Sequence, residues 1–112
     1  MPGHILVDLD GTLAHYDDWK GEDKIGEPVP AMVNRVKKWL DEGIEVRIFT
    51  ARASGRMTPQ EHVQVLHAIH NWCHDHLGVA LEVTNEKDYG CIAIYDDRAW
   101  HVVPNEGRII GE

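Results

Sequence analysis

The chain of 112 residues has the length of one domain, and its 43% of apolar residues suffices for a single hydrophobic core. A formal net charge of −8 argues against a protein that binds the phosphate backbone of a nucleic acid, because such a protein needs a basic face; a small anionic substrate at a local basic site is not excluded. There is no run of about 18 apolar residues, no signal-peptide pattern and no disulfide framework, so we expect one cytoplasmic domain over residues 1–112, away from membranes.

A first buried strand is predicted over residues 4–9, and it runs into the sequence Asp8-Leu9-Asp10-Gly11-Thr12. Because side chains alternate along a strand, Asp8 and Asp10 share a face or flank one turn, and Gly11 permits a sharp turn of the backbone. Carboxylates that close are unfavourable unless a cation, a proton or phosphoryl chemistry uses them. The alternative is an ordinary strand-to-loop junction in which Asp10-Gly11 makes a turn.

Residues 13–27 are polar and lack a sustained hydrophobic period, which predicts an ordered loop or a small hairpin. Tyr16 and Trp19 stand out in this acidic segment. Trp19 has no place on an apolar stripe, so we expect it either to attach the segment to the domain or to cover a site. Four acids of the segment are expected to repel highly anionic substrates: Asp17, Asp18, Glu22 and Asp23.

Strands and helices alternate along the rest of the chain. Thr58 and Glu61 form a capping box that starts a helix, and Gly43 and Gly78 suit the positions just past two helix ends. This alternation predicts a mostly parallel sheet with helices on its faces. The expected elements are a helix over residues 31–42, a strand over 44–50, a loop over 51–57, a helix over 59–77, strands over 80–84 and 91–95, and a last edge strand over 99–103.

The second of these helices is rich in histidine. His70 and His74 have the i, i+4 spacing of a zinc pair, and His67 lies on the same flank. No third ligand and no nearby general base are evident. A solvated helix flank is therefore preferred over a zinc site.

Chemistry-bearing residues follow three of the predicted strands. Asp8 and Asp10 end the first, Thr50 ends the second, and Asp96-Asp97 follows the strand over 91–95. Ligands of parallel sheets sit beyond the carboxyl ends of the strands, so these residues are expected to share one site. Asp96 itself could equally be a turn-forming residue.

These residues resemble the motifs of the haloacid dehalogenase superfamily of aspartate-nucleophile phosphatases. The first motif is matched by residues 8–12, the second by Thr50, the third by Lys87 and the fourth by Asp96-Asp97, so the resemblance covers residues 4–103. It implies an α/β, three-layer Rossmann-like fold with a mostly parallel central sheet. Residues 13–27 would form a flap over the nucleophile, and there would be no cap domain, since neither 13–27 nor 51–57 is long enough to hold one.

The resemblance also implies roles for the aspartates. Asp8 would attack phosphorus and form an aspartyl-phosphate, while Asp10 would protonate the leaving oxygen and then activate water. Mg²⁺ would be held by Asp8, the backbone carbonyl of Asp10 and Asp97, with Asp96 orienting a metal-bound water or supporting Asp97. Dehalogenases of the superfamily lack the second acid of the first motif, so Asp10 favours phosphoryl chemistry.

Phosphate-binding roles are implied for three further residues. Thr50 and the next backbone amide would hold phosphate oxygens, Lys87 would neutralise charge on Asp8 and the phosphoryl group, and Arg52, like Arg98, could contact substrate or be an ordinary ion-pairing arginine. One departure concerns Lys87, because only residues 85–90 separate two strands that should be parallel. A parallel crossover usually needs a dozen residues or more, so either the preceding strand is stunted or Lys87 lies on a tight loop.

The sequence thus predicts a Mg²⁺-dependent phosphatase acting on an unidentified phosphomonoester. The alternatives are a non-catalytic phosphate- or metal-binding module on the same fold and a phosphotransferase that uses an acceptor other than water. Sugar phosphates, nucleotides, nucleic-acid ends and phosphoproteins all remain open as substrates, although the acidity of the chain disfavours nucleic acid. An open site without a cap also suggests a large substrate or a homo-oligomer.

Overall fold

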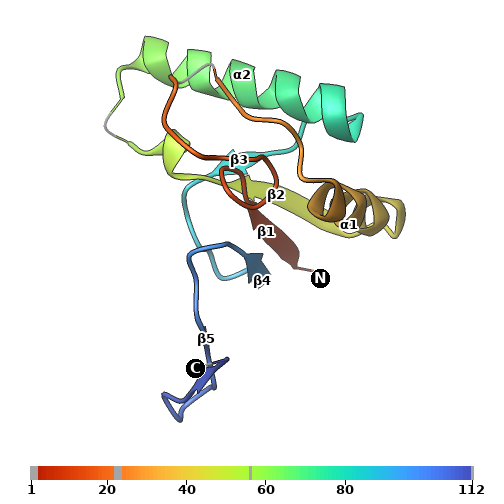
Figure 1. The fold of residues 1–112 in the computed structure, drawn as a ribbon, viewed down its shortest axis with the longest axis vertical. Coiled ribbons are helices and arrows are strands. Elements are labelled where there is room, and N and C mark those ends of the chain that lie inside the picture. The colour runs from red at the N-terminus through yellow and green to blue at the C-terminus, as the bar shows by residue number, and fades with distance from the viewer. Residues whose placement is uncertain (1–2, 22–23, 56, 112) are drawn as a thin grey trace.

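Strand β1 (His4–Asp8) lies at the centre of the fold, and its residues Ile5, Leu6 and Val7 are buried on both faces of the sheet. The computed structural model describes residues 3–21, 24–55 and 57–111. They form an α/β fold in which helices flank a four-stranded parallel sheet (Figure 1). The further elements are α1 (Pro30–Asp41), β2 (Glu45–Phe49), the 3₁₀ turn η1 (Ala51–Ala53), α2 (Pro59–Leu77), β3 (Val83–Thr84), β4 (Cys91–Tyr95), β5 (His101–Val102) and β6 (Ile109–Ile110).

The strands lie in the order β3-β2-β1-β4, and all three pairings are parallel. In the register, Ile5 of β1 lies opposite Val46 of β2 and Ala93 of β4. The chain therefore builds outward from β1 to β3 and then returns to the other side of β1. Because the strand order reverses at β1, a crevice is expected at the carboxyl ends of β1 and its two neighbours.

Both α-helices of the described chain pack against one face of the sheet. Val33 of α1 and Ile69 of α2 belong to one buried core with Ile5 and Val7, which are alternate residues of β1 and so share a face. The two helices also contact each other. They form a single layer, so the three-layer arrangement expected from the sequence is not confirmed in the described residues. None of the helices described is long and apolar enough to cross a membrane.

The segment 85–90 runs along the opposite face of the sheet. Its Asp88 accepts a hydrogen bond from Arg47 at 3.1 Å and lies 3.0 Å from His4 Nε2. To return from β3 to the start of β4, the chain must cross three strand spacings of about 4.8 Å and also run back along the length of a five-residue strand. These two perpendicular displacements combine to about 21 Å, which an extended chain of six or seven residues can just span. The short connection is explained by a stunted third strand, Val83–Thr84 instead of 80–84.

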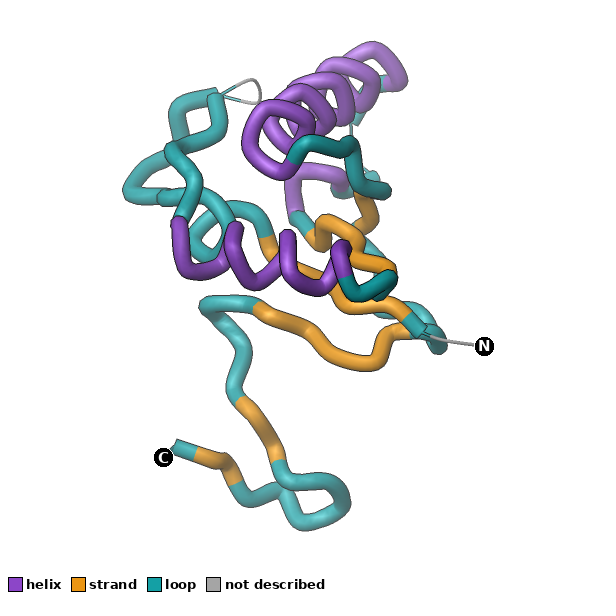
Figure 2. Tube along the Cα trace, turned by 90° about the vertical axis from the view of Figure 1, so that its right-hand side faces the viewer, coloured by secondary structure: helices purple, strands orange, loops and turns teal. Residues whose placement is uncertain are grey.

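The C-terminal residues do not extend the main sheet. β5 pairs antiparallel with β6, Val102 lying opposite Ile109, in a hairpin that projects away from the domain (Figures 1 and 2). The expected edge strand over 99–103 is therefore wrong. Asn105 and Gly107 have φ angles of 65° and 76° and form a tight turn, which returns residues 109–110 as a local partner for β5.

Candidate active site

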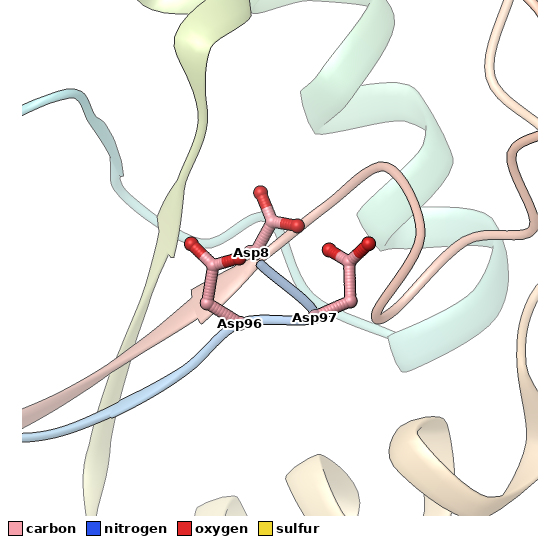
Figure 3. Close-up of side chains that lie close together, drawn as sticks. All are labelled: Asp8, Asp96 and Asp97. Atoms are coloured by element: carbon pink, nitrogen blue, oxygen red, sulfur yellow. The ribbon is translucent and has the colours of Figure 1, made fainter. Parts of the chain in front are cut away.

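Three carboxylates meet at the carboxyl ends of β1 and β4. Asp8 is the last residue of β1, and Asp96 and Asp97 directly follow β4. One carboxylate oxygen from each lies within 4.8 Å of the other two, and the three side chains point to the same side of the sheet (Figure 3). The family resemblance implied a metal site of Asp8, the backbone carbonyl of Asp10 and Asp97, with Asp96 beside it, and the structure brings these three carboxylates together.

Thr12 links the two ends of this cluster. Its Oγ1 lies 3.2 Å from Asp8 Oδ2 and 3.2 Å from Asp97 Oδ1, and it accepts the backbone N–H of Asp97 at 3.0 Å. A hydroxyl has one proton to donate and can accept as well, so it suits a position between two carboxylates and an amide. No role was predicted for Thr12, although its place in the motif over residues 8–12 was a signal.

The turn after β1 requires glycine at position 11. The Leu9 carbonyl accepts hydrogen bonds from the N–H groups of Leu13 and Ala14, at 3.0 and 2.8 Å, which turns the chain back on itself. Gly11 lies in this turn with a φ of 91°, and a β-carbon there would lie 2.6 Å from Asp97 Oδ2. Glycine therefore serves both the backbone conformation and the close approach of Asp97.

The carboxylate cluster makes ionisation of Asp8 costly. The pKa of Asp8 is raised from its ordinary 3.8 to about 7, first by burial and then by a hydrogen bond with the Asp97 side chain and the charge of Asp96, while the hydrogen bond from Thr12 opposes the rise. A divalent cation beside these groups would favour the ionised form of Asp8. The site therefore has the oxygen donors and the unfavourable negative charge that a hard cation such as Mg²⁺ relieves.

Asp10 is held by a buried arginine from the η1 turn. Arg52 Nε and Nη2 donate to the two carboxylate oxygens of Asp10, at 2.6 and 3.0 Å. The same guanidinium donates to the backbone carbonyls of Gly21 and Lys24, at 3.3 and 2.8 Å, and lies 4.7 Å from the ring centroid of Trp19. Arg52 was expected either to contact substrate or to be an ion-pairing arginine. The ion pair is observed: its side chain is 4% exposed and joins Asp10 to the segment that follows β1.

In the described residues of the segment 13–27 the two ends pair, which favours the small hairpin over the ordered loop that the sequence also allowed. Ala14 makes an antiparallel bridge with Pro28, and the N–H of His15 donates to the Glu27 carbonyl at 2.7 Å. Trp72 Nε1 of α2 donates to the Gly26 carbonyl at 2.9 Å, which fixes the hairpin to the helix layer. We call this segment the flap. Two of the acids expected to repel anions lie outside the described residues: Glu22 and Asp23.

A cavity of about 480 Å³ opens beside the carboxylates. Thr50 lines it and is buried, and its Oγ1 accepts the backbone N–H of Arg52 at 3.1 Å, which starts the η1 turn. The lining combines acidic, basic and aromatic side chains and comprises Asp8, Asp10, Tyr16, Trp19, Phe49, Thr50, Ala51, Arg52, Asn85, Asp96, Asp97 and Arg98. Asn85, which sequence analysis missed, follows β3 directly, and its position after a strand was the available signal.

Lys87 is not among the residues that line this cavity. It is exposed on the segment 85–90, and no ion pair joins it to any of the described residues. Arg98 does line the cavity; its backbone N–H donates to Asp96 Oδ1 at 2.8 Å, and its side chain is in no ion pair with a described residue. Among the cations of the described lining, Arg52 is engaged by Asp10, so Arg98 is the one positioned to meet an added anion.

The histidine-rich flank of α2 gathers no metal site within the described residues. His67 and His74 are exposed. Among all the described residues, the only group of three side chains placed to bind one metal ion is Asp8, Asp96 and Asp97, at the strand ends. His76 packs instead against Trp72, with ring centroids 4.7 Å apart. The exposure of His67 and His74 agrees with the preference for a solvated flank.

Comparison with known proteins supports the fold alone. No family model matches the chain, and no curated protein sequence matches it. A solved structure described as a conserved protein coded by a locus from Bacteroides thetaiotaomicron is similar, with a TM-score of 0.60 and 20% sequence identity. The similarity covers 88% of this chain and 78% of that one. The arrangement of strands and helices therefore recurs in another protein, and the chemistry has to be argued from the site.

Proposed function

We propose that this protein is a Mg²⁺-dependent phosphatase that acts on a phosphomonoester through an aspartyl-phosphate on Asp8. The observation that carries the proposal is the meeting of Asp8 with Asp96 and Asp97 at the strand ends, with Asp10 held beside them by Arg52. The strand order and the flap after β1 support a capless, Rossmann-like domain of the haloacid dehalogenase type.

Metal binding would use oxygen ligands of this chain. The carboxylates of Asp8 and Asp97 and the backbone carbonyl of Asp10 are the proposed ligands, and Asp96 lies close enough to add another or to orient a bound water. When bound, Mg²⁺ would offset the negative charge that the phosphoryl group adds to the site.

The covalent step would begin at Asp8. A carboxylate oxygen of Asp8 attacks phosphorus, the bond between phosphorus and the ester oxygen breaks, and Asp10 protonates the leaving alcohol. Water then attacks phosphorus and gives its proton to the Asp10 carboxylate, which releases inorganic phosphate, restores the Asp8 carboxylate and returns Asp10 to its protonated form. Thr12, which contacts Asp8 and Asp97, would hold the nucleophile in place.

Arg52 would act as a positioning residue for Asp10. Both oxygens of Asp10 accept hydrogen bonds from Arg52, which is the arrangement of a base ready to take a proton from water. Donation of a proton in the first step requires that one of these two hydrogen bonds is given up. Because Arg52 also binds two flap carbonyls, the position of the flap and the orientation of Asp10 would be linked.

The phosphoryl oxygens would be bound by groups at the end of β2 and after β4. Thr50 and the adjacent backbone amide remain the proposed hydrogen-bond donors, as the family resemblance implies. Lys87 was proposed to neutralise the phosphoryl charge, and Arg98 is a second candidate for that role because it lines the cavity. Asp17 and Asp18 of the flap would favour monophosphates over more highly charged substrates.

The proposal is tested by hydrolysis of an aryl phosphate in Mg²⁺ by three variants. Asp8→Asn should lower kcat by roughly 10⁴-fold or more, because an amide cannot be the nucleophile, and Asp10→Asn by about 10²–10⁴-fold. Asp75→Asn, at an exposed position of α2, is the control and should keep wild-type activity. Asp10→Asn should still bind Mg²⁺ in a calorimetric titration, since the proposed ligand there is a backbone carbonyl.

The outcomes separate the alternatives. Wild-type turnover by Asp8→Asn would end the covalent mechanism. Mg²⁺ binding without turnover of any phosphomonoester would assign the chain to a non-catalytic binding module. Phosphate appearing on an added alcohol rather than in solution would make the protein a phosphotransferase. Self-association, which an open site suggests, is measured by sedimentation of the same preparations.

A further inference from the structure

Three aromatic side chains contribute to the lining of the cavity. Tyr16 and Trp19 enter it from the flap, and Phe49 enters it from the end of β2. Tyr16 and Trp19 are 39% and 51% exposed, although large aromatic side chains usually bury more of their surface. Aromatic side chains exposed at the mouth of a cavity provide flat apolar surface to a ligand.

Trp19 is held in position before any ligand binds. The Arg52 guanidinium lies 4.7 Å from its ring centroid, and Asp10 holds Arg52 in turn through two hydrogen bonds. The backbone N–H of Trp19 donates to Asp18 Oδ1 at 2.9 Å. A ring fixed in this way loses little conformational entropy when a ligand stacks on it, and that makes the contact more favourable.

The rest of the lining contains few uncharged polar side chains. Apart from the charged residues, its polar side chains are Thr50, whose hydroxyl already accepts an N–H of the chain, and Asn85. Asn85 is exposed and offers both a donor and an acceptor, which can pair with the edge of a heterocyclic ring. The cavity, about 480 Å³, lies in the usual range of small-molecule sites.

We infer that the preferred substrates are phosphomonoesters whose alcohol carries a planar aromatic or heteroaromatic ring, with nucleoside monophosphates as the representative class. The phosphate would lie at Asp8 and the ring between the flap aromatics and Phe49. This inference rests on the proposed phosphatase function, because it assigns the leaving group of that reaction.

The decisive comparison uses adenosine 5′-monophosphate and ribose 5-phosphate in Mg²⁺. Both esters release phosphate from a primary alcohol on C5 of a ribose, so the chemical step is closely matched and the base is the main difference. Stacking of one base on an aromatic side chain is worth about fivefold to 150-fold in affinity, so kcat/KM should favour the nucleotide by at least about fivefold. Equal values for the two esters would overturn the ring inference and leave the phosphatase proposal standing.

Variants then locate the preference. Trp19→Ala and Tyr16→Ala should reduce the ratio of the two kcat/KM values toward one, whereas Tyr89→Ala, at an exposed tyrosine outside the cavity, should leave it unchanged. Measuring both substrates on one preparation cancels any loss of folded protein. A ratio that falls equally in all three variants, or in none, would contradict stacking on the flap.

Failure of the proposed function gives a different result. If neither ester is hydrolysed, calorimetric titration of both into the protein with Mg²⁺ decides the matter. Tighter binding of the nucleotide, lost in Trp19→Ala, would retain the ring site and reject hydrolysis alone. Equal binding, or none, would reject the ring site as well.

Discussion

Replacing Asp8 by Asn should stabilise the protein while removing its proposed nucleophile. The pKa of Asp8 is about 7 in the folded chain and near 3.8 when the chain is unfolded, because burial and two neighbouring carboxyl groups oppose its charge. Between these values the folded chain binds more protons at Asp8 than the unfolded chain does. The free energy of unfolding of the wild type therefore falls as pH rises from about 4 to about 7.

The size of the effect follows from this shift. A difference of about three pKa units corresponds to about 4 kcal/mol, and since Asp8 is only half-buried, screening by water reduces this to about 2 kcal/mol. The Asn side chain does not ionise, but it has nearly the same shape as that of Asp. We expect Asp8→Asn to match the wild type near pH 4 and to exceed its free energy of unfolding by about 2 kcal/mol at pH 8, or by about 8 °C in Tm for a chain of this length.

The assay is urea and thermal unfolding at several pH values with a chelator present, with Asp75→Asn as the exposed control. Asp75→Asn should show no comparable rise between pH 4 and pH 8. Adding Mg²⁺ at about 100 times its Kd should stabilise the wild type by about 2.7 kcal/mol and Asp8→Asn by less. The difference in free energy of unfolding between Asp8→Asn and the wild type should therefore become smaller or change sign. An Asp8→Asn variant less stable than the wild type at pH 8 in chelator would refute the assignment of unfavourable charge to this site.

Three further predictions concern the rest of the site. Because Arg98 lines the cavity and Lys87 does not, Arg98→Ala should lower kcat/KM for a phosphomonoester by about tenfold or more, and Lys87→Ala should change it by less than twofold. A larger loss in Lys87→Ala than in Arg98→Ala would make Lys87 the phosphate-binding cation. Asp97→Asn should weaken Mg²⁺ affinity in a calorimetric titration and regain part of its activity at high Mg²⁺, and an activity indifferent to excess metal would show that Asp97 does not bind it. Gly11→Ala should lower the free energy of unfolding by about 1–3 kcal/mol and abolish activity, because its β-carbon would collide with the Asp97 carboxylate, and unchanged urea unfolding would contradict this geometry.

The elements that the sequence predicted well are those defined by local patterns. Thr58 Oγ1 accepts the Glu61 N–H and the Glu61 side chain accepts the Thr58 N–H, both at 3.2 Å, so the predicted capping box is confirmed. Gly78 ends α2 in the left-handed conformation, as expected. The predicted helix over 31–42 agrees with α1 to within one residue at each end. Each of these features depends on residues within one or two turns of each other, so a short window of sequence contains the cause.

The expectation that residues at the ends of parallel strands lie close together also predicted part of the site. Asp8 and Asp97 come together because Asp8 ends β1 and Asp97 lies just past the end of β4, and the carboxyl ends of parallel strands meet at one edge of a sheet. Lys87 was assigned to the site on family resemblance alone, and it is not among the residues that line the cavity. Segment 85–90 is too short to do more than reach β4 in an extended path, and Lys87 is exposed on it.

By itself, the sequence determined the bounds of both α-helices and of β1, β2 and β4 to within one residue, and which residues stand at their ends, since hydrophobic period and capping are local. Tertiary structure alone decided which distant residues pair. Arg52 binds Asp10 across 42 positions of sequence and Thr12 binds Asp97 across 85, and neither residue carries a local sign of its partner. Residues 101–102 have the pattern of a strand, yet they pair with 109–110 instead of the main sheet, because a tight turn supplies a nearby partner at a lower loop-closure entropy.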